Sequence, residues 1–331
     1  MLETKRPGPS LPSPGTLHLP HLIVVRRRLN YRSMRISPDL RSTDAALGLR
    51  SKFDTASPFP HIVVENVLTG LASSLSAEFP DPQWEGWSRF EDRYEPGKMF
   101  CNDITAIPPA LAEIIAELSQ PAFLEFLEAL TGIPNLLVDP YLEGGGLHCS
   151  GPGGVLVPHT DFHLHPRLGL YRRINVLVYF NEGWEESWGG SLELFAPGDA
   201  DTPAKSVLPE WGNCVIFRTD DRSRHGFTQP VQEPHFRRSI ALYYYTATEA
   251  DTFSGDTATH WSRIPVNGPW ERARQGAYRA LISISRGFSV LAWLFDPGTD
   301  IRSKSTWRKI SDLVRKKTRK WRSGRPGNVD D

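Results

Sequence analysis

The chain has 331 residues, of which 39% are hydrophobic and 11% aromatic, so it is long and apolar enough to build a substantial core. Lys+Arg and Asp+Glu are equal at 38 each, and the formal net charge is therefore zero. This balance removes any global electrostatic reason to bind nucleic acid or an anionic membrane, and no nucleic-acid partner is expected.

The three cysteines, Cys101, Cys149 and Cys214, form no CxxC pair. Such a sparse, odd set argues against a disulfide framework and against a structural zinc site, and it favours a reducing, cytoplasmic setting. The first residues, MLETKRPGPSLPSPG, lack the apolar segment and the cleavage pattern of a secretory signal peptide. The most apolar late segment, residues 280–295, is short and contains an arginine, so no transmembrane segment is expected.

Residues 1–51 combine Pro, Arg and Ser with little apolar periodicity, and we expect this N-terminal segment to be disordered. A translation start at Met34 is an open alternative.

Order is expected from near Phe59, where HIVVENVL predicts a strand followed by a helix. Two further helices are predicted, one from Pro109 through ALAEIIAEL and one over residues 120–130, where apolar residues recur at three- and four-residue spacing.

From residue 136 onward, short apolar runs alternate with Gly, Pro and Asn clusters. The runs are LLVDPYLE, VLVPHTDF, INVLVYF, SLELF, CVIFRT and RRSIALYYYT. This texture predicts an antiparallel sandwich or barrel, and the helices before it predict a helical layer packed on a β core. The expected fold class is therefore mainly β with flanking helices (α+β), in one domain over residues 52–250.

Residues 251–331 are predicted to form a helical, basic C-terminal extension. The segment TWRKISDLVRKKTRKWRS places Trp307, Ile310 and Val314 on one approximate helical face, with Lys and Arg over the rest. A solvated helix docked by its narrow apolar stripe explains this pattern. The alternative is contact with an acidic partner or an anionic membrane surface.

The sequence Pro158-His159-Thr160-Asp161 is the first element of a candidate metal site. Residues i and i+2 of a strand point to the same side, so His159 and Asp161 can reach one point, and a returning strand can bring His225 to the third corner. Two imidazoles and one carboxylate on one face of an octahedron suit Fe(II) and leave positions for a bidentate oxo-acid and O₂. An isolated HxD is weak evidence, however, and gains its weight from the motifs that follow.

Arg237 lies shortly after His225, in the run FRRSIALYYYT. A planar guanidinium can form two parallel hydrogen bonds with the distal carboxylate of an oxo-acid. Strand alternation puts Ser239 on the same face as Arg237, where it could donate a further hydrogen bond, whereas Arg238 should point out of the pocket.

The motifs HTD, VLVYFNEGW, WGGSLELF, His225-Gly226 and RRSIALYYY follow one another in this order. This order resembles the prolyl-4-hydroxylase-like branch of the Fe(II)/2-oxoglutarate-dependent oxygenases, over about residues 136–247. The resemblance implies a double-stranded β-helix (a cupin-like jelly roll) over that range, with Fe(II) as cofactor, 2-oxoglutarate as co-substrate and ascorbate as a candidate further cofactor. His159, Asp161 and His225 would hold the metal and Arg237 the oxo-acid.

The resemblance also implies that Tyr179 helps to hold the carboxylate bound by Arg237. Many relatives carry a second tyrosine for 2-oxoglutarate shortly before the HxD, but this chain has Leu147-His148-Cys149-Ser150 there. Either His148 or Ser150 takes that polar role, or the contact is missing. Gly189 and Gly190 are interpreted as turn residues without a functional role.

The expected activity is that of a 2-oxoglutarate-dependent dioxygenase that hydroxylates an amino-acyl, peptidyl or small-metabolite substrate and releases succinate and CO₂. Residues expected at the substrate rim are Phe162, His163, Arg172, Trp184 and Trp188, with Glu143 as a further candidate. The competing class is a non-catalytic, cupin-like ligand-binding module, which predicts an incomplete triad or no clamp. A zinc hydrolase would leave Arg237 without a role.

Overall fold

A computed structural model of the chain describes residues 35–69, 72–89, 93–199, 201–248 and 259–261, together with four single positions at 269, 270, 273 and 277. The chain forms two compact units, residues 1–260 and 261–331. Most of the predicted basic C-terminal extension, including its helix, lies outside the described residues, as do residues 1–34. The strand β13 (His260–Trp261) falls at the boundary of the two units.

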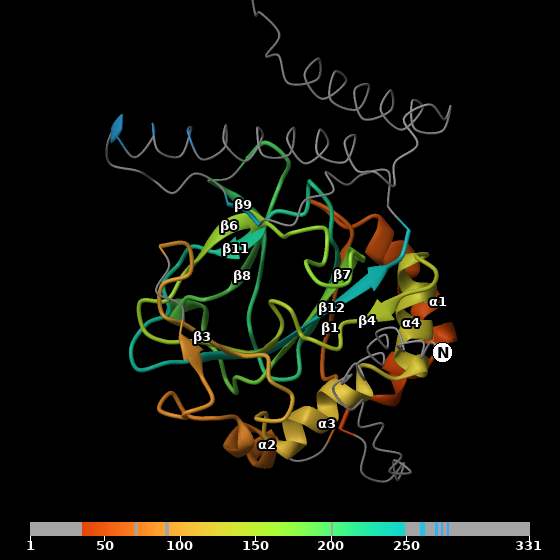
Figure 1. Ribbon diagram of the computed structural model, residues 1–331, viewed down its shortest axis with the longest axis horizontal. Coiled ribbons are helices and arrows are strands. Elements are labelled where there is room, and N and C mark those ends of the chain that lie inside the picture. Colours follow the sequence, from red (N-terminus) through yellow and green to blue (C-terminus); the bar gives the residue numbers. More distant parts are fainter. Residues whose placement is uncertain are drawn as a thin grey trace, which may run out of the picture. The chain divides into compact units, whose positions relative to one another are not determined.

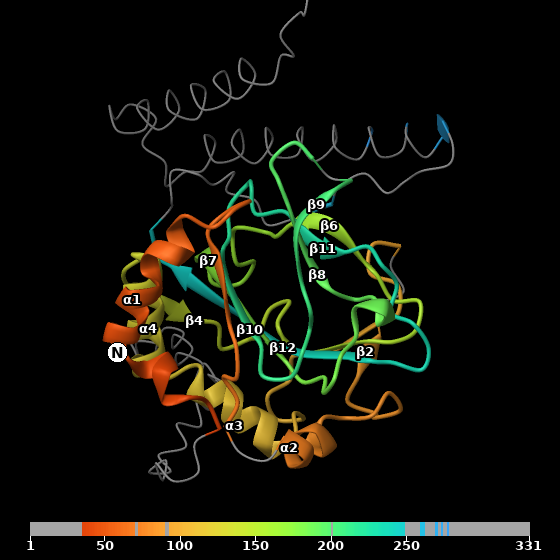
Figure 2. The same ribbon diagram turned by 180° about the vertical axis from the view of Figure 1, so that it is seen from behind.

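A large antiparallel sheet is the main structural element of the first unit (Figures 1 and 2). Its spatial order is β1-β10-β7-β12-β5-β3-β2, and β4 pairs with β12 beside this path. The strands are β1 (His61–Val64), β2 (Ser88–Arg89), β3 (Lys98–Cys101), β4 (Leu137–Val138), β5 (Gly146–Ser150), β7 (Tyr171–Tyr179), β10 (Cys214–Arg218) and β12 (Arg237–Thr246).

A smaller antiparallel sheet lies against the inner face of the large one, with the order β6-β11-β8-β9. Its strands are β6 (Leu156–Thr160), β8 (Leu192–Phe195), β9 (Pro203–Val207) and β11 (His225–Phe227). Leu192 and Leu194 of this sheet pack on Tyr179, Val215 and Phe217 of the large sheet. Two facing antiparallel sheets with an apolar filling confirm the predicted jelly roll, although β1, β2 and β3 extend it upstream of residue 136.

Helices cover the outer face of the large sheet, as Figures 1 and 2 show. They are η2 (Pro38–Arg41), α1 (Thr43–Asp54), α2 (Ala72–Glu78), α3 (Pro109–Glu117) and α4 (Pro121–Thr131), while η3 (Glu186–Trp188) lies in a loop before β8. Strand alternation turns Val176 and Val178 toward Ile114 and Phe126, which belong to the same buried cluster. The predicted helices over residues 109–130 are thus present. No described helix is long and apolar enough to cross a membrane.

The prediction that residues 1–51 are disordered is wrong for residues 35–51. This stretch forms η2 and most of α1, and the Ser42 hydroxyl caps α1 by accepting a hydrogen bond from the Ala45 amide. Leu40 and Phe53 are buried in the helical layer. Local apolar periodicity is weak here and does not reveal this order. The segment is fixed instead by a residue distant in sequence, Glu117 at the end of α3.

The Glu117 carboxylate is buried and accepts three hydrogen bonds. The amides of Arg35 and Ile36 donate at 2.9 and 3.0 Å, and Arg41 Nη2 donates at 2.7 Å. One side chain therefore satisfies two backbone amides and one charge of a segment more than seventy residues earlier in the chain.

Replacing Glu117 with Ala should lower the free energy of unfolding by about 2–4 kcal/mol, because the amides and the Arg41 guanidinium lose a buried partner. Urea denaturation followed by circular dichroism measures the loss. Glu113→Ala is the matched control on the same helix, since the Glu113 side chain is 49% exposed in its pair with Arg35, and it should cost no more than about 1 kcal/mol. Equal losses for the two variants would contradict the anchoring role of Glu117.

Candidate metal and oxo-acid site

The pairing of β6 with β11 brings the three predicted metal ligands together. His159 in β6 lies directly opposite His225 in β11, and Asp161 follows β6 by one residue. The His159 Nε2 atom is 3.3 Å from Asp161 Oδ1, and His225 Nε2 is 3.6 Å from Asp161 Oδ2. One ligand atom from each residue lies within 4.8 Å of the others, and all three residues are buried.

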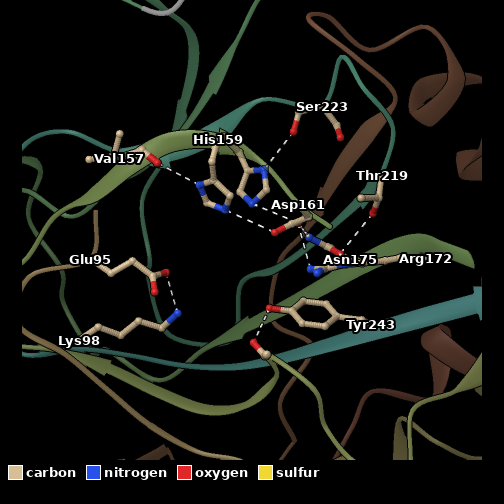
Figure 3. A network of polar contacts seen from close by, with 12 residues as sticks. Glu95, Lys98, Val157, His159, Asp161, Arg172, Asn175, Thr219, Ser223 and Tyr243 are labelled. Carbon is tan, nitrogen blue, oxygen red and sulfur yellow. Dashed lines mark hydrogen bonds and ion pairs between the residues drawn. The ribbon is translucent and has the colours of Figure 1, made fainter. Parts of the chain in front are cut away.

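Backbone carbonyls set the orientation of both imidazoles (Figure 3). His159 Nδ1 is 2.9 Å from the Val157 carbonyl oxygen, and His225 Nδ1 is 3.0 Å from that of Ser223. When Nδ1–H donates to a carbonyl, the lone pair of a neutral ring is on Nε2, the atom that faces Asp161 here. Burial lowers the pKa of His225 to about 4, although Asp161 acts in the opposite direction.

The Asp161 carboxylate is ionised despite its burial. Burial disfavours the charge, but the Arg172 guanidinium acts in the opposite direction and is the main cause that holds the pKa of Asp161 well below its usual range. Two neutral nitrogen donors and one carboxylate oxygen converge on one point, which fits a divalent metal such as Fe(II) in a facial arrangement. The residues present therefore suit the metal that the motif predicts.

A second layer of contacts fixes the Asp161 oxygen that faces away from His159. Asn175 Nδ2 donates to Asp161 Oδ2 at 2.7 Å, and Asn175 Oδ1 accepts from Arg172 Nε at 2.8 Å. Arg172 Nη2 lies 2.9 Å from the same Oδ2, held by charge rather than by an aligned hydrogen bond. Thr219 completes the network with a hydrogen bond to Asn175 Oδ1 at 3.3 Å.

The prediction that Arg172 lies at the substrate rim is wrong. The side chain is 1% exposed, and its guanidinium carbon lies 3.3 Å from the centre of the Tyr243 ring and 4.8 Å from that of Phe162. An arginine can be buried this way because its charge is paired with Asp161 and its faces are covered by aromatic rings. Phe162, predicted at the rim, is half-buried over this guanidinium.

The prediction that His163 lies at the substrate rim is also wrong, because its side chain is fully buried, as is that of His165. His163 Nδ1 lies 3.5 Å from Asp221, and His165 Nε2 lies 3.1 Å from Asp139. The strand ends before them, so the alternation that would have turned them toward Asp161 does not continue.

Arg237, at the start of β12, is buried on the inner face of the large sheet. Its Nε donates to the Gly190 carbonyl at 2.7 Å and its Nη2 to the Tyr179 hydroxyl at 3.0 Å. Burial raises the pKa of Tyr179 against the opposing charge of Arg237, so the phenol keeps a proton to donate. Ser239 lies directly opposite Tyr179 and is buried, so the three predicted oxo-acid contacts share one face.

Arg238 points away from the pocket, as predicted, on the face of β12 opposite to Arg237. Its guanidinium carbon lies 5.9 Å from the centre of the Phe79 ring in the helical layer. The Gly190 carbonyl accepts a hydrogen bond from Arg237, a contact that the sequence did not reveal, and a Cβ at Gly190 would lie 3.1 Å from the Arg237 Cδ. The φ of +68° at Gly190 also favours glycine.

His148 and Ser150, the two candidates for the missing tyrosine contact, both turn to this face from β5. Ser150 lies opposite Arg237 and His148 opposite Ser239. Burial, with the charges of Lys98 and Arg237, lowers the pKa of His148 well below its ordinary value. Lys98 was not predicted at the site, because the four-residue strand KMFC carries no motif.

Trp184 and Trp188, also predicted at the rim, lie in the loop before β8. Trp184 is buried and its Nε1 donates to the Gly189 carbonyl at 2.9 Å, while Trp188 stacks on His235 with ring centres 3.6 Å apart. Trp184 therefore supports the Gly189-Gly190 turn beside Arg237, and the half-buried Trp188 is the more accessible of the two.

Comparison with known proteins identifies the β core. Residues 145–245 match the family model of the 2OG-Fe(II) oxygenase superfamily. The prolyl 3-hydroxylase OGFOD1 of Xenopus laevis is 26% identical over 135 residues, which are 40% of this chain and 25% of that protein. Its Mus musculus counterpart is 30% identical over 77 residues, 22% of this chain and 14% of that protein, so the chain spans a quarter or less of these relatives' length.

Solved structures with a similar course of the chain include two prolyl hydroxylases. The enzyme from Trichoplax adhaerens, in complex with a hypoxia-inducible-factor peptide, is 18% identical with a TM-score of 0.43 and covers 62% of this chain and 90% of its own. The prolyl-4-hydroxylase of Pseudomonas putida is 19% identical with a TM-score of 0.42 and covers 61% and 100%. Residues 145–245, which carry the triad and the clamp, are therefore similar to the 2OG-Fe(II) oxygenase superfamily.

Proposed function

We propose that this protein is an Fe(II)- and 2-oxoglutarate-dependent dioxygenase that hydroxylates a C–H bond of an amino-acyl, peptidyl or small-metabolite substrate and releases succinate and CO₂. The observation that carries the proposal is the placement of a complete metal triad and an arginine clamp on the two facing sheets of one jelly roll. A ligand-binding module without catalysis would need neither part.

His159, Asp161 and His225 would hold Fe(II), which with 2-oxoglutarate and O₂ supplies the oxidising chemistry. The chain itself contributes position and charge. The Nε2 lone pairs are aimed by the backbone carbonyls, and Asn175 and Arg172 hold one oxygen of Asp161 so that the other is directed at the metal.

The co-substrate would be bound through its distal carboxylate. Arg237 uses Nε and Nη2 to bind Gly190 and Tyr179, so its remaining N–H groups can donate to that carboxylate together with the Tyr179 and Ser239 hydroxyls. Phe227 lies over the guanidinium at 4.6 Å and helps to keep water from this end of the pocket.

A prolyl group is the first substrate that we propose, because the two relatives from Xenopus laevis and Mus musculus named above are prolyl 3-hydroxylases. Phe162 and Trp188, which were predicted at the rim and are both half-buried aromatic residues, remain candidates for contact with it. Ascorbate as a further cofactor, an acidic partner for the basic C-terminal segment and a cytoplasmic location remain predictions from the sequence.

Replacing His159, Asp161 or His225 with Ala should abolish Fe(II)-dependent succinate release, because two remaining ligands do not hold the metal in the required geometry. Anaerobic titration of the Fe(II) protein with 2-oxoglutarate, read by its visible charge-transfer band, gives a second measurement. Asp201→Ala, at an exposed residue, should leave both signals unchanged. Turnover retained in any of the three variants would disprove the triad.

Arg237→Met should weaken 2-oxoglutarate binding by about tenfold or more while Fe(II) affinity stays unchanged, because a charge-assisted pair of hydrogen bonds is lost. The 2-oxoglutarate affinity of Arg237→Lys should lie between that of the wild type and that of Arg237→Met, since lysine keeps the charge but not the planar fork. Arg238→Met is the matched control, one residue along the same strand and on its opposite face. Equal losses in the Arg237 and Arg238 variants would argue against the clamp.

A further inference from the structure

Lys98 is a second cation on the same face of the large sheet as Arg237. The cross-strand row runs from Arg237 in β12 to Ser150 in β5 and on to Lys98 in β3. Directly opposite residues of antiparallel strands point to the same side, and two strand spacings separate the two backbones by roughly 10 Å. Met99 and Cys101, the alternate residues of β3, face the helical layer instead.

The turn before β3 links the two sheets at the metal end. The Tyr94 carbonyl accepts from the amide of Val157, which lies in β6 two residues before His159. Glu95 follows directly, and its carboxylate accepts a hydrogen bond from Lys98 Nζ at 2.8 Å. The side chains of Glu95 and Lys98 are only 11% and 19% exposed, and Figure 3 shows the pair across from His159 and Tyr243.

The charges around the site do not balance when the metal and the co-substrate are bound. The described residues contribute three cations, Arg172, Arg237 and Lys98, against two carboxylates, Asp161 and Glu95. The two positive charges of Fe(II) and the two negative charges of 2-oxoglutarate cancel, so these five residues leave the loaded site with one excess positive charge, although Lys98 itself is paired with Glu95. A buried charge is costly unless it is paired, so this end of the pocket favours one further anion.

A polar atom beside Lys98 also needs a ligand. His148 Nε2 is buried and has no hydrogen-bond partner among the described residues. His148 lies opposite Phe100 in β3, on the same face as Lys98 and one cross-strand row away. Buried polar atoms are nearly always satisfied, so a bound molecule or water is expected at this nitrogen.

We propose that Lys98 is the anchor for a free carboxylate of the substrate, in a polar subsite that it forms with Glu95 and His148. Glu95 holds the ammonium in place and gives way to, or shares it with, the incoming carboxylate. This rests on the proposed function and narrows its substrate class to small molecules or chain ends that carry a free carboxylate. A residue inside a peptide, whose carbonyl is an amide, would lack the required charge.

The test uses anaerobic protein loaded with Fe(II) and 2-oxoglutarate, titrated calorimetrically with N-acetyl amino acids. Each probe is offered as the free acid and as the N-methylamide, two forms that differ chiefly in one negative charge. The best-binding acid should bind about tenfold or more tightly than its amide, and Lys98→Met should reduce that ratio to within about twofold. Glu95→Gln should raise the affinity for the acid, because Gln cannot neutralise the ammonium.

Lys205→Met is the matched control at an exposed lysine of β9, and it should leave the ratio unchanged. The inference is overturned if acids and amides bind with equal affinity or if no acid binds. It is also overturned if Lys98→Met weakens the binding of 2-oxoglutarate, because Lys98 would then belong to the co-substrate site. Because Glu95→Gln and Lys98→Met act in opposite directions, a general loss of folding cannot imitate the result. Failure of the wild type to bind 2-oxoglutarate would instead disprove the proposed function.

Discussion

The register between β6 and β11 is the constraint on which the site depends. His225 reaches the metal point only because it lies directly opposite His159, and a slip of one residue would turn it to the other face of the sheet. Gly226 allows this close pairing, since a Cβ there would lie 2.5 Å from the Leu156 carbonyl oxygen. Bonding of β11 to β8 on its other side holds the register from both edges.

Asp161 connects the metal point to the large sheet. Its carboxylate comes from the end of a strand in the small sheet, yet Asn175 and Arg172, both in β7, hold one of its oxygens. These contacts stabilise the negative charge of Asp161 without a metal. They also orient the carboxylate before a metal binds, which lowers the conformational cost of metal binding. The two sheets are joined at this point by polar contacts as well as by their apolar filling.

Strand alternation and ordered motifs were sufficient to predict the triad, and the same alternation separated Arg237 from Arg238. The sequence contains no comparable pattern that indicates which charged side chains are buried. An arginine is usually exposed, and the burial of Arg172 is explained by its pairing with Asp161 and its cover of aromatic rings, which the sequence did not reveal. Glu117 likewise orders residues 35–51 through contacts distant in sequence, and Lys98 enters the site through a cross-strand register that no local pattern in β3 reveals.

The two cations on the inner row suit different tasks. Arg237 is fixed by Gly190, Tyr179 and the Phe227 ring, and such a rigid fork fits a co-substrate that is the same in every turnover. Lys98 is a compact charge on a flexible stem, held by a carboxylate of its own chain that a ligand can displace. Because Glu95 is beside the ammonium whenever the substrate is absent, the cation can release one substrate and accept the next without being left buried and uncompensated.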